Sequence, residues 1–309
     1  MPRIKVIVNP LAGRGYAARV TALIERTFGE LGADYSLVRT TAPGEAIRLA
    51  REARDEGYEV IVAVGGDGTS HEVINGMAEG MGGNLVGTLG CIPAGSGNDF
   101  AVMSGAPVDI AAAVRQIVAG KTRIQDLGRV TIDNRVTRYF DNAVGIGFDG
   151  VVTVVGKRFK WLRGMALYIP VVLRTIFVDM VPPRVRIEID GQVIEQTTLM
   201  TVICNGPREG GSFLVSPKAR TDDGLFDVVM VETMPRLQML AMVPRFLAGS
   251  HVSDPRCRIQ QGTHVLVTSE DALILHADGE VLIDVAHRVE AEMVAARLRI
   301  IAPADLATA

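Results

Sequence analysis

The sequence GGDGT stands at Gly65–Thr69, directly after the apolar run Val60–Val64. Glycines let backbone N–H groups approach a phosphate, and a following helix would add the favourable dipole of its N-terminus. Asp67 would repel a phosphate unless a cation lay between them, so the loop indicates a site for phosphate and metal together. The alternative is an ordinary turn between a strand and a helix. Thr69 with Glu72 also fits a capping box, which predicts that the helix starts here.

Two more polar, glycine-bearing loops follow apolar runs. They are Asn9–Gly13, with the sequence NPLAG, and Pro93–Asp99, with the sequence PAGSGND. Loops after parallel strands gather at one edge of a sheet, where ligands bind, so the three loops together predict a nucleotide pocket. The P-loop sequence GxxxxGK[ST] is absent, which excludes a P-loop enzyme. Ser96 matches a GxSxG nucleophile elbow only in part, and hydrolase chemistry is rejected.

Acids later in the chain leave alternatives open. Asp278-Gly279-Glu280 reads equally as a hairpin turn, like Asp190-Gly191, or as two carboxylates that serve as metal ligand and general base for a hydroxyl nucleophile. Thr221–Leu225, with the sequence TDDGL, reads better as a turn, although its acids and carbonyls could hold Mg²⁺ or Ca²⁺. The histidines show no metal-binding spacing, so a histidine-based metal site is not expected.

The segment Gly145–Gly150 formally matches the dinucleotide motif GxGxxG. No acid stands between Asp149 and Asp179 to bind a ribose about 20 residues on, as that motif requires. We therefore interpret this segment as a closely packed strand end.

The elements that position the first three loops alternate between strand and helix patterns. Short apolar runs and helical periodicities follow one another, which predicts a parallel sheet with helices on both faces. The expected strands are Ile4–Val8, Tyr35–Val38, Val60–Val64 and Leu85–Ile92, and the expected helices are Ala17–Leu31, Pro43–Glu56, Ser70–Glu79 and Val108–Ala119.

After about residue 126 the pattern becomes one of strand pairs around Asp-Asn or Asp-Gly, which are hairpin signals. These turns are at 133–134, 190–191 and 278–279, and the last would join strands Ala272–His276 and Val281–Val285. We expect an α/β domain over 1–127, an antiparallel β-sandwich over 128–294 with helical inserts near 151–178 and 235–248, an active site in the cleft between them, and a tail from about 295 to 309 that returns to the first domain.

Composition narrows the class of protein. The 309 residues carry 32 Lys+Arg and 35 Asp+Glu, a net charge of −3, which argues against nucleic-acid binding. The three cysteines lack CxxC spacing and fit a reducing compartment. No secretory signal or spanning helix is recognised, so a cytoplasmic protein is expected. Residues 151–178 mix bases with aromatic side chains, which suits an anionic membrane surface or, alternatively, two helices packed on the β domain.

With NPLAG, GGDGTSHEVINGMAEG, IPAGSGNDFA, FDNAVGIGFDG, ARTDDGLFDVVMV and ADGE in this order, the chain resembles the bacterial diacylglycerol kinase-like lipid kinases. The likeness runs from about Lys5 to Ile300. Ser96 stands where Thr is usual, and Ser70-His71 replaces the more common Leu-Asn after GGDGT.

The resemblance implies an ATP-binding α/β domain, a β-sandwich substrate domain and roles for particular residues. Glu280 would be the general base, and Asp278 would join Asp67 in a magnesium-linked carboxylate network. A structural magnesium would use Asp223 and backbone oxygens of Arg220 and Leu225. The implied ATP contacts are Asn9, Pro10, Leu11, Ala12, Gly13, Thr40, Gly66, Asp67, Gly68, Thr69, Ser70, His71, Glu72 and Ser96.

The resemblance therefore implies transfer of the γ-phosphoryl group of ATP, with Mg²⁺, to a lipid hydroxyl, first of all that of diacylglycerol. The alternatives are another lipid, such as phosphatidylglycerol or a sphingoid base, NAD, or a nucleotide-binding regulator without transfer activity. The expected partners are ATP and a lipid at the inner membrane face, which the protein would contact peripherally. Because members of the family often form dimers, a homodimer is also expected.

Overall fold

The computed structural model describes residues 1–82, 86–156 and 164–303. Its chain forms two compact units. Unit 1 contains Met1–Leu127 and the C-terminal residues from Ala295, and unit 2 contains Gly128–Val294.

Unit 1 is built on a parallel sheet. Strands β1 (Ile4–Val8), β2 (Tyr35–Arg39), β3 (Val60–Gly65) and β4 (Thr88–Pro93) pair in the order β2-β1-β3-β4. The end of β14 (Ala286–Ile301) adds to β4 in parallel. Every residue of β3 and β4 is buried, as expected for central strands that helices cover on both faces.

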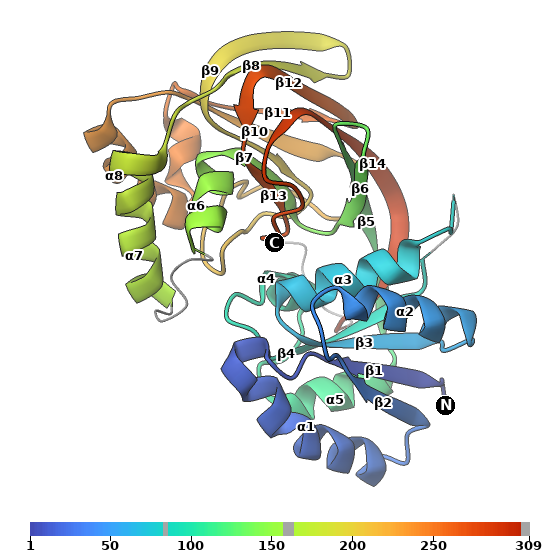
Figure 1. Cartoon of the computed structure of the whole chain (residues 1–309). Helices are drawn as coiled ribbons and strands as arrows, with labels where there is room; N and C mark the ends of the chain where they lie inside the picture. Colours follow the sequence, from blue (N-terminus) through green and yellow to red (C-terminus); the bar gives the residue numbers. More distant parts are fainter. Residues whose placement is uncertain (83–85, 157–163, 304–309) are drawn as a thin grey trace. The chain divides into compact units, whose positions relative to one another are not determined.

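The helices of unit 1 lie on both sides of this sheet (Figure 1). Helices α2 (Glu45–Asp55) and α3 (Asp67–Ala78) pack together on one side, and α1 (Ala12–Glu30) and α5 (Ile110–Ala119) pack together on the other. A short helix, α4 (Asp99–Ser104), follows β4 and was not predicted. The predicted parallel α/β architecture is confirmed.

The predicted capping box is wrong. Helix α3 begins at Asp67 with Gly66 as its N-cap, so Thr69 already lies in its first turn. The Glu72 carboxylate instead accepts the backbone N–H groups of Gly44 and Ala46, at 2.9 and 3.1 Å. These donors lie at the start of α2, where the unpaired N–H groups of a helix attract a carboxylate from a neighbouring element.

Unit 2 is an antiparallel β-sandwich, which confirms the second half of the predicted fold. Its strands pair as β6-β5-β14-β12-β8-β9 in one sheet and as β13-β7-β9-β10-β11 in the other. The 13-residue strand β9 therefore belongs to both sheets. The bounds are β5 Thr122–Ile132, β6 Val136–Phe140, β7 Ala143–Gly147, β8 Arg184–Ile189, β9 Gln192–Cys204, β10 Phe226–Glu232, β11 Cys257–Gly262, β12 His264–Leu273 and β13 Leu275–Ala277.

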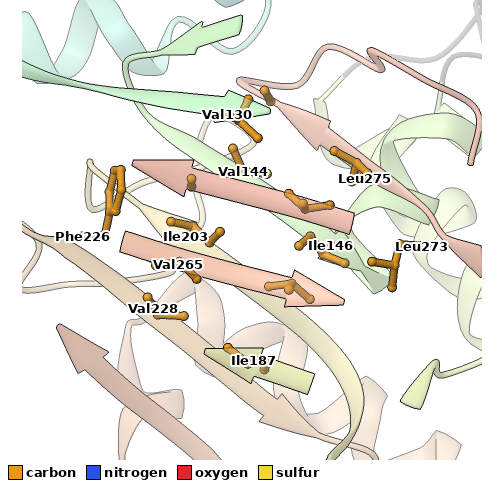
Figure 2. Packing of buried hydrophobic residues seen from close by; sticks show 14 of the residues in the cluster. Val130, Val144, Ile146, Ile187, Ile203, Phe226, Val228, Val265, Leu273 and Leu275 are labelled. Atoms are coloured by element: carbon orange, nitrogen blue, oxygen red, sulfur yellow. The ribbon is translucent and has the colours of Figure 1, made fainter. Parts of the chain in front are cut away.

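Apolar side chains of both sheets meet in one core (Figure 2). Phe140 and Phe226 stack there with ring centroids 5.5 Å apart. Gly128 makes room for this pair, because a Cβ atom at Gly128 would lie 2.1 Å from the Phe140 ring. The core thus fixes the strands whose ends carry the acids singled out in the sequence.

Two of the three predicted hairpins form as expected. Asp133 and Asn134 turn between β5 and β6, and Asp190 and Gly191 turn between β8 and β9, all with positive φ. Asp278-Gly279 also turns with positive φ, but the strand predicted after it is absent. Only Ala277 and Glu280 bridge, and the apolar side chains farther on pack against the core without a strand partner.

Helical inserts occur where they were predicted. They comprise α6 (Phe148–Gly156), α7 (Gly164–Arg174), the π-helical turn η1 (Thr175–Asp179) and α8 (Arg236–Leu247), with a 3₁₀ turn, η2, at Ser250–Ser253. The basic and aromatic run at 157–163 lies outside the described residues. Among the described helices, none has the length and apolarity needed to cross a membrane.

Candidate functional site

The three glycine-bearing loops of unit 1 touch one another. A Cβ atom at Gly95 would lie 2.3 Å from the Cα atom of Gly66, and one at Gly13 would lie 2.4 Å from the carbonyl oxygen of Ala94. Both positions therefore require glycine, because backbone from another loop occupies the space of a side chain. The predicted gathering of these loops at the carboxyl edge of the sheet follows from these contacts.

Asp67 joins two of these loops through backbone hydrogen bonds. Its Oδ2 accepts the N–H of Asn98 at 2.8 Å, and its Oδ1 accepts the N–H of Phe100 at 3.0 Å. The third loop is attached through Asn9, whose Nδ2 donates to Thr69 Oγ1 at 3.2 Å and whose Oδ1 accepts the N–H of Leu11 at 3.1 Å. A carboxylate oxygen can accept more than one hydrogen bond or bind a cation as well, so this role of Asp67 is compatible with metal binding.

Asn98 closes the PAGSGND loop and was not singled out from the sequence. It lies in the left-handed region with φ 62°, which Asn tolerates better than most residues. Its Oδ1 accepts the N–H of Gly95 at 2.9 Å, and its Nδ2 donates to the carbonyl of Gly95 at 3.2 Å. The Asn that follows Ser-Gly in the sequence could have predicted this role, since Asn commonly closes tight turns through its own side chain.

The predicted ATP contacts divide into two groups by exposure. Those at the loop tips are at least partly exposed: Asn9, Pro10, Leu11, Ala12, Gly13, Gly66, Asp67, Gly68 and Ser96. Thr40, Thr69, Ser70 and His71 are buried. Ser70 Oγ lies 4.0 Å from Cys91 Sγ inside the unit, and Glu72 holds the start of α2. Only the first group presents backbone to a ligand at the surface.

In unit 2, Asp278 is buried, and its carboxylate accepts three backbone N–H groups. These are the N–H groups of Asp141 at 3.2 Å, Asn142 at 3.0 Å and Ala143 at 3.1 Å. Its own N–H donates to the carbonyl of Ala143 at 2.9 Å. Asp278 therefore fixes the turn that carries Glu280, which is partly exposed.

Replacing Asp278 with Gly should destabilise the protein while keeping the turn geometry, because Gly adopts φ 49° without strain. Three buried N–H groups would lose their acceptor, which we expect to cost about 3 kcal/mol or more in the free energy of unfolding. Urea unfolding would measure the loss. Asp190→Gly is the matched control, since Asp190 occupies a similar but exposed turn. Equal losses in both variants would contradict the importance of burial.

The loop before β10 fits the donor chemistry of a magnesium site. Asp223 Oδ1 accepts the N–H of Leu225 at 3.1 Å, while Arg220 pairs with Asp222 at 3.2 Å. Gly224 has φ 74°, so the chain turns sharply there. Carboxylate and carbonyl oxygens are the ligands that Mg²⁺ prefers. The assignment of this ion to Asp223, Arg220 and Leu225 stays a prediction.

A cluster that the sequence did not predict lies beside the Asp278 turn. His276 Nε2 is 3.0 Å from Asp149 Oδ2 and 3.1 Å from Glu209 Oε1. The three side chains together could hold a metal ion. Burial raises the pKa of Asp149, but its interactions with His276 and Glu209 lower it by more, so the pKa of Asp149 lies below its usual value. The three residues come from segments that are far apart in the sequence, so no local spacing of histidines predicts the cluster.

Both halves of the chain match known protein families. Residues 3–130 match the diacylglycerol kinase catalytic domain family, and residues 142–302 match the YegS C-terminal NAD kinase beta sandwich-like domain family. The chain is 29% identical over 290 residues to diacylglycerol kinase of Bacillus subtilis (strain 168), covering 91% of this chain and 90% of that protein. It is 30% identical over 286 residues to diacylglycerol kinase of Staphylococcus aureus (strain JH9), covering 90% and 86%.

A solved structure shares the fold. The crystal structure of a diacylglycerol kinase from Bacillus anthracis str. Sterne superposes with a TM-score of 0.75 at 22% identity, covering 99% of this chain and 98% of that chain. The catalytic-domain match and these curated relatives together show a lipid kinase of the diacylglycerol kinase type. The chain belongs to the bacterial diacylglycerol kinase-like lipid kinase family.

Proposed function

We propose that this lipid kinase transfers the γ-phosphoryl group of ATP to the hydroxyl of diacylglycerol. The observation that carries the proposal is the contact of three glycine-bearing loops in unit 1, two of which Asp67 joins through backbone hydrogen bonds. Relatives that span most of the chain are named diacylglycerol kinase, which supports this lipid as the acceptor.

The glycines of the three loops would hold the phosphates of ATP. Gly13, Gly66 and Gly68 are partly exposed and have no side chain that could shield their backbone N–H groups from a ligand. Gly66 and Asp67 also lie at the start of α3, whose N-terminal dipole attracts anions. Ser96 would add a hydroxyl at an exposed loop tip. Asn9–Gly13 would complete the site. Thr40 and Ser70–Glu72 would support it from beneath, because their side chains are buried or have structural partners.

Glu280 would accept the proton of the lipid hydroxyl. A general base must lie within reach of the proton that it removes, and a partly exposed carboxylate on a fixed turn meets the requirement for access. Mg²⁺ would neutralise the charge on the phosphates, with Asp67 as one of its carboxylate ligands, while Asp278 would hold the turn that carries Glu280. Phosphoryl transfer depends mostly on such positioning and charge stabilisation. A second Mg²⁺ would hold the loop at Asp223 together.

An exposed apolar face on α7 and the following turn would contact the lipid surface. Ile169, Leu173 and Phe177 are spaced by four residues, so they share one side of the helical segment. Their exposed fractions are 51%, 40% and 43%. Val178 and Val181, exposed by 67% and 82%, extend the apolar surface. Burying a large apolar side chain contributes about 1.5–3 kcal/mol, so two or three suffice for reversible binding.

The double variant Leu173→Asp, Phe177→Asp should bind vesicles of phosphatidylglycerol and phosphatidylcholine at least about tenfold more weakly, because two apolar contacts are lost and two like charges face the membrane. Co-sedimentation would measure the binding. Val108→Asp is the control, since Val108 is 85% exposed but belongs to unit 1. Unchanged vesicle binding in the double variant would remove this face from membrane contact.

The decisive assay offers labelled ATP and Mg²⁺ with a panel of acceptors in mixed micelles. The panel contains diacylglycerol, phosphatidylglycerol, a monoacylglycerol, sphingosine and a ceramide, with NAD as the soluble control. Label in phosphatidic acid would support the proposal. Label in another lipid would change the substrate, and label only in NADP would contradict lipid phosphorylation. ATP binding without transfer would favour a regulator.

A further inference from the structure

The cluster of His276, Asp149 and Glu209 combines three segments of unit 2. His276 lies on β13, Asp149 lies in the first turn of α6, and Glu209 follows β9. The exposed fraction of the side chain is 1% for His276, 21% for Asp149 and 10% for Glu209. None of the three has a role in the proposed phosphoryl transfer, yet two carboxyl groups and an imidazole are costly to bury.

The second ring nitrogen of His276 connects this cluster to the turn that carries Glu280. His276 Nδ1 lies 3.1 Å from the backbone N–H of Gly279, which donates to it. A backbone N–H can only donate, so Nδ1 must carry a lone pair. The proton of the neutral ring then lies on Nε2, which hydrogen-bonds to Asp149 Oδ2 at 3.0 Å, while Glu209 Oε1 lies 3.1 Å away.

This arrangement favours a proton over a metal ion at Nε2. A metal bound to Nε2 of a neutral imidazole would require the proton on Nδ1, where it would face the N–H of Gly279 donor to donor. With the proton on Nε2, every short contact of the ring pairs a donor with an acceptor. The cluster therefore acts as a hydrogen-bonded support.

The surrounding fold makes room for this contact. Gly145 on β7 pairs with His276 on β13. A Cβ atom at Gly145 would lie 2.2 Å from Asp149 Oδ2 and 2.5 Å from His276 Nε2. The absence of a side chain in GxGxxG thus allows the histidine and the carboxylate to meet, and this use of the motif agrees with a closely packed strand end.

We propose that His276 is a positioning residue, which Asp149, with Glu209 beside it, holds in the Nε2–H tautomer so that Nδ1 fixes the N–H of Gly279 and thereby the direction of Glu280. The inference rests on the proposed function, in which Glu280 is the general base. His276 itself touches neither substrate in this mechanism. It acts on the reaction through the turn.

Two substitutions separate the two contacts of the ring. His276→Asn keeps an acceptor near the position of Nδ1, and His276→Gln keeps an N–H donor near the position of Nε2. Because small misplacements of a catalytic group are costly, we expect kcat to fall about tenfold or more in His276→Gln and less than about threefold in His276→Asn. The KM for ATP should stay constant in both. His264→Asn, which alters the partly exposed His264–Glu290 contact in the same unit, is the control.

Hydrogen exchange of the Gly279 amide provides a readout that does not need activity. Exchange should be slow in the wild type and in His276→Asn, and fast in His276→Gln. Equal exchange in all three, or equal kcat in the two variants of an active enzyme, would overturn the positioning role. If the exchange rates are as expected but the protein phosphorylates no lipid, the His276–Gly279 contact is upheld and the proposed function fails. If the purified protein contains stoichiometric zinc or manganese and the Glu209→Gln variant does not, then Nε2 binds a metal ion instead of carrying a proton, and the proposal is overturned.

Discussion

Glu280→Gln should reduce lipid phosphorylation by about 10²- to 10⁴-fold, because a general base contributes about that much to the rate. Gln has nearly the same shape as Glu but cannot take up the proton of the lipid hydroxyl. Its backbone contacts with Ala277 do not involve the side chain, so the turn should persist. The proposed ATP contacts belong to unit 1, and ATP affinity should therefore stay unchanged. Initial rates and an ATP titration would measure the two effects separately.

Glu270→Gln is the matched control for this prediction. It makes the same change at an exposed glutamate on β12, in the same unit. A rate within about twofold of wild type is expected there, since surface substitutions rarely change a protein by more than 0.5 kcal/mol. Full activity in Glu280→Gln would remove Glu280 from the mechanism. A loss of both activity and folded structure would show that the variant tests stability instead.

The fold class could be predicted because its signals are local. Apolar runs of five or six residues followed by glycine-rich loops and helical periodicity predict parallel strands, and Asp-Gly or Asp-Asn pairs predict tight turns. The structure confirms both signals, with β3 fully buried and with positive φ at Asp133 and Asp190. The three loops could be predicted to gather for the same reason, since the direction of parallel strands decides which ends meet.

The errors arose where a long-range partner decides the outcome. Glu72 matches a local capping pattern, but its carboxylate binds the start of α2, 26 and 28 residues earlier. Val281–Ile283 form an apolar run typical of a strand, yet in the described part of the chain no strand pairs with them. His276 and Asp149 are 127 residues apart, so no spacing rule connects them. Burial and partners that tertiary structure creates are invisible to a local pattern.

Gly95→Ala should abolish ATP binding at working concentrations, because it separates the loops that form the proposed site. The added methyl group would lie 2.3 Å from Gly66 Cα, 2.8 Å from Asn98 Oδ1 and 2.9 Å from Gly66 N. Two of these atoms are backbone, so a rotamer change cannot relieve the clash and the loops must move. Hydrogen bonds to a charged group contribute about 1.5–3 kcal/mol each, so the loss of two backbone contacts to the phosphates should lower ATP affinity by about 10²-fold or more. Calorimetric or fluorescence titration with ATP would measure it.

The thermal stability of Gly95→Ala shows whether a loss of ATP binding comes from the displaced loops or from unfolding of the protein. Overpacking typically costs about 1–3 kcal/mol, which should lower the unfolding midpoint without removing the fold. Gly29→Ala is the control: a Cβ atom there meets no atom within 4 Å, and Gly29 lies inside helix α1. Since Ala stabilises a helix relative to Gly by about 0.5–1 kcal/mol, this variant should bind ATP normally and unfold at a slightly higher temperature. Normal ATP affinity in Gly95→Ala would show that ATP binds elsewhere than at the contact of the three loops, and the nucleotide site would then have to be sought outside Asn9–Gly13, Gly65–Thr69 and Pro93–Asp99.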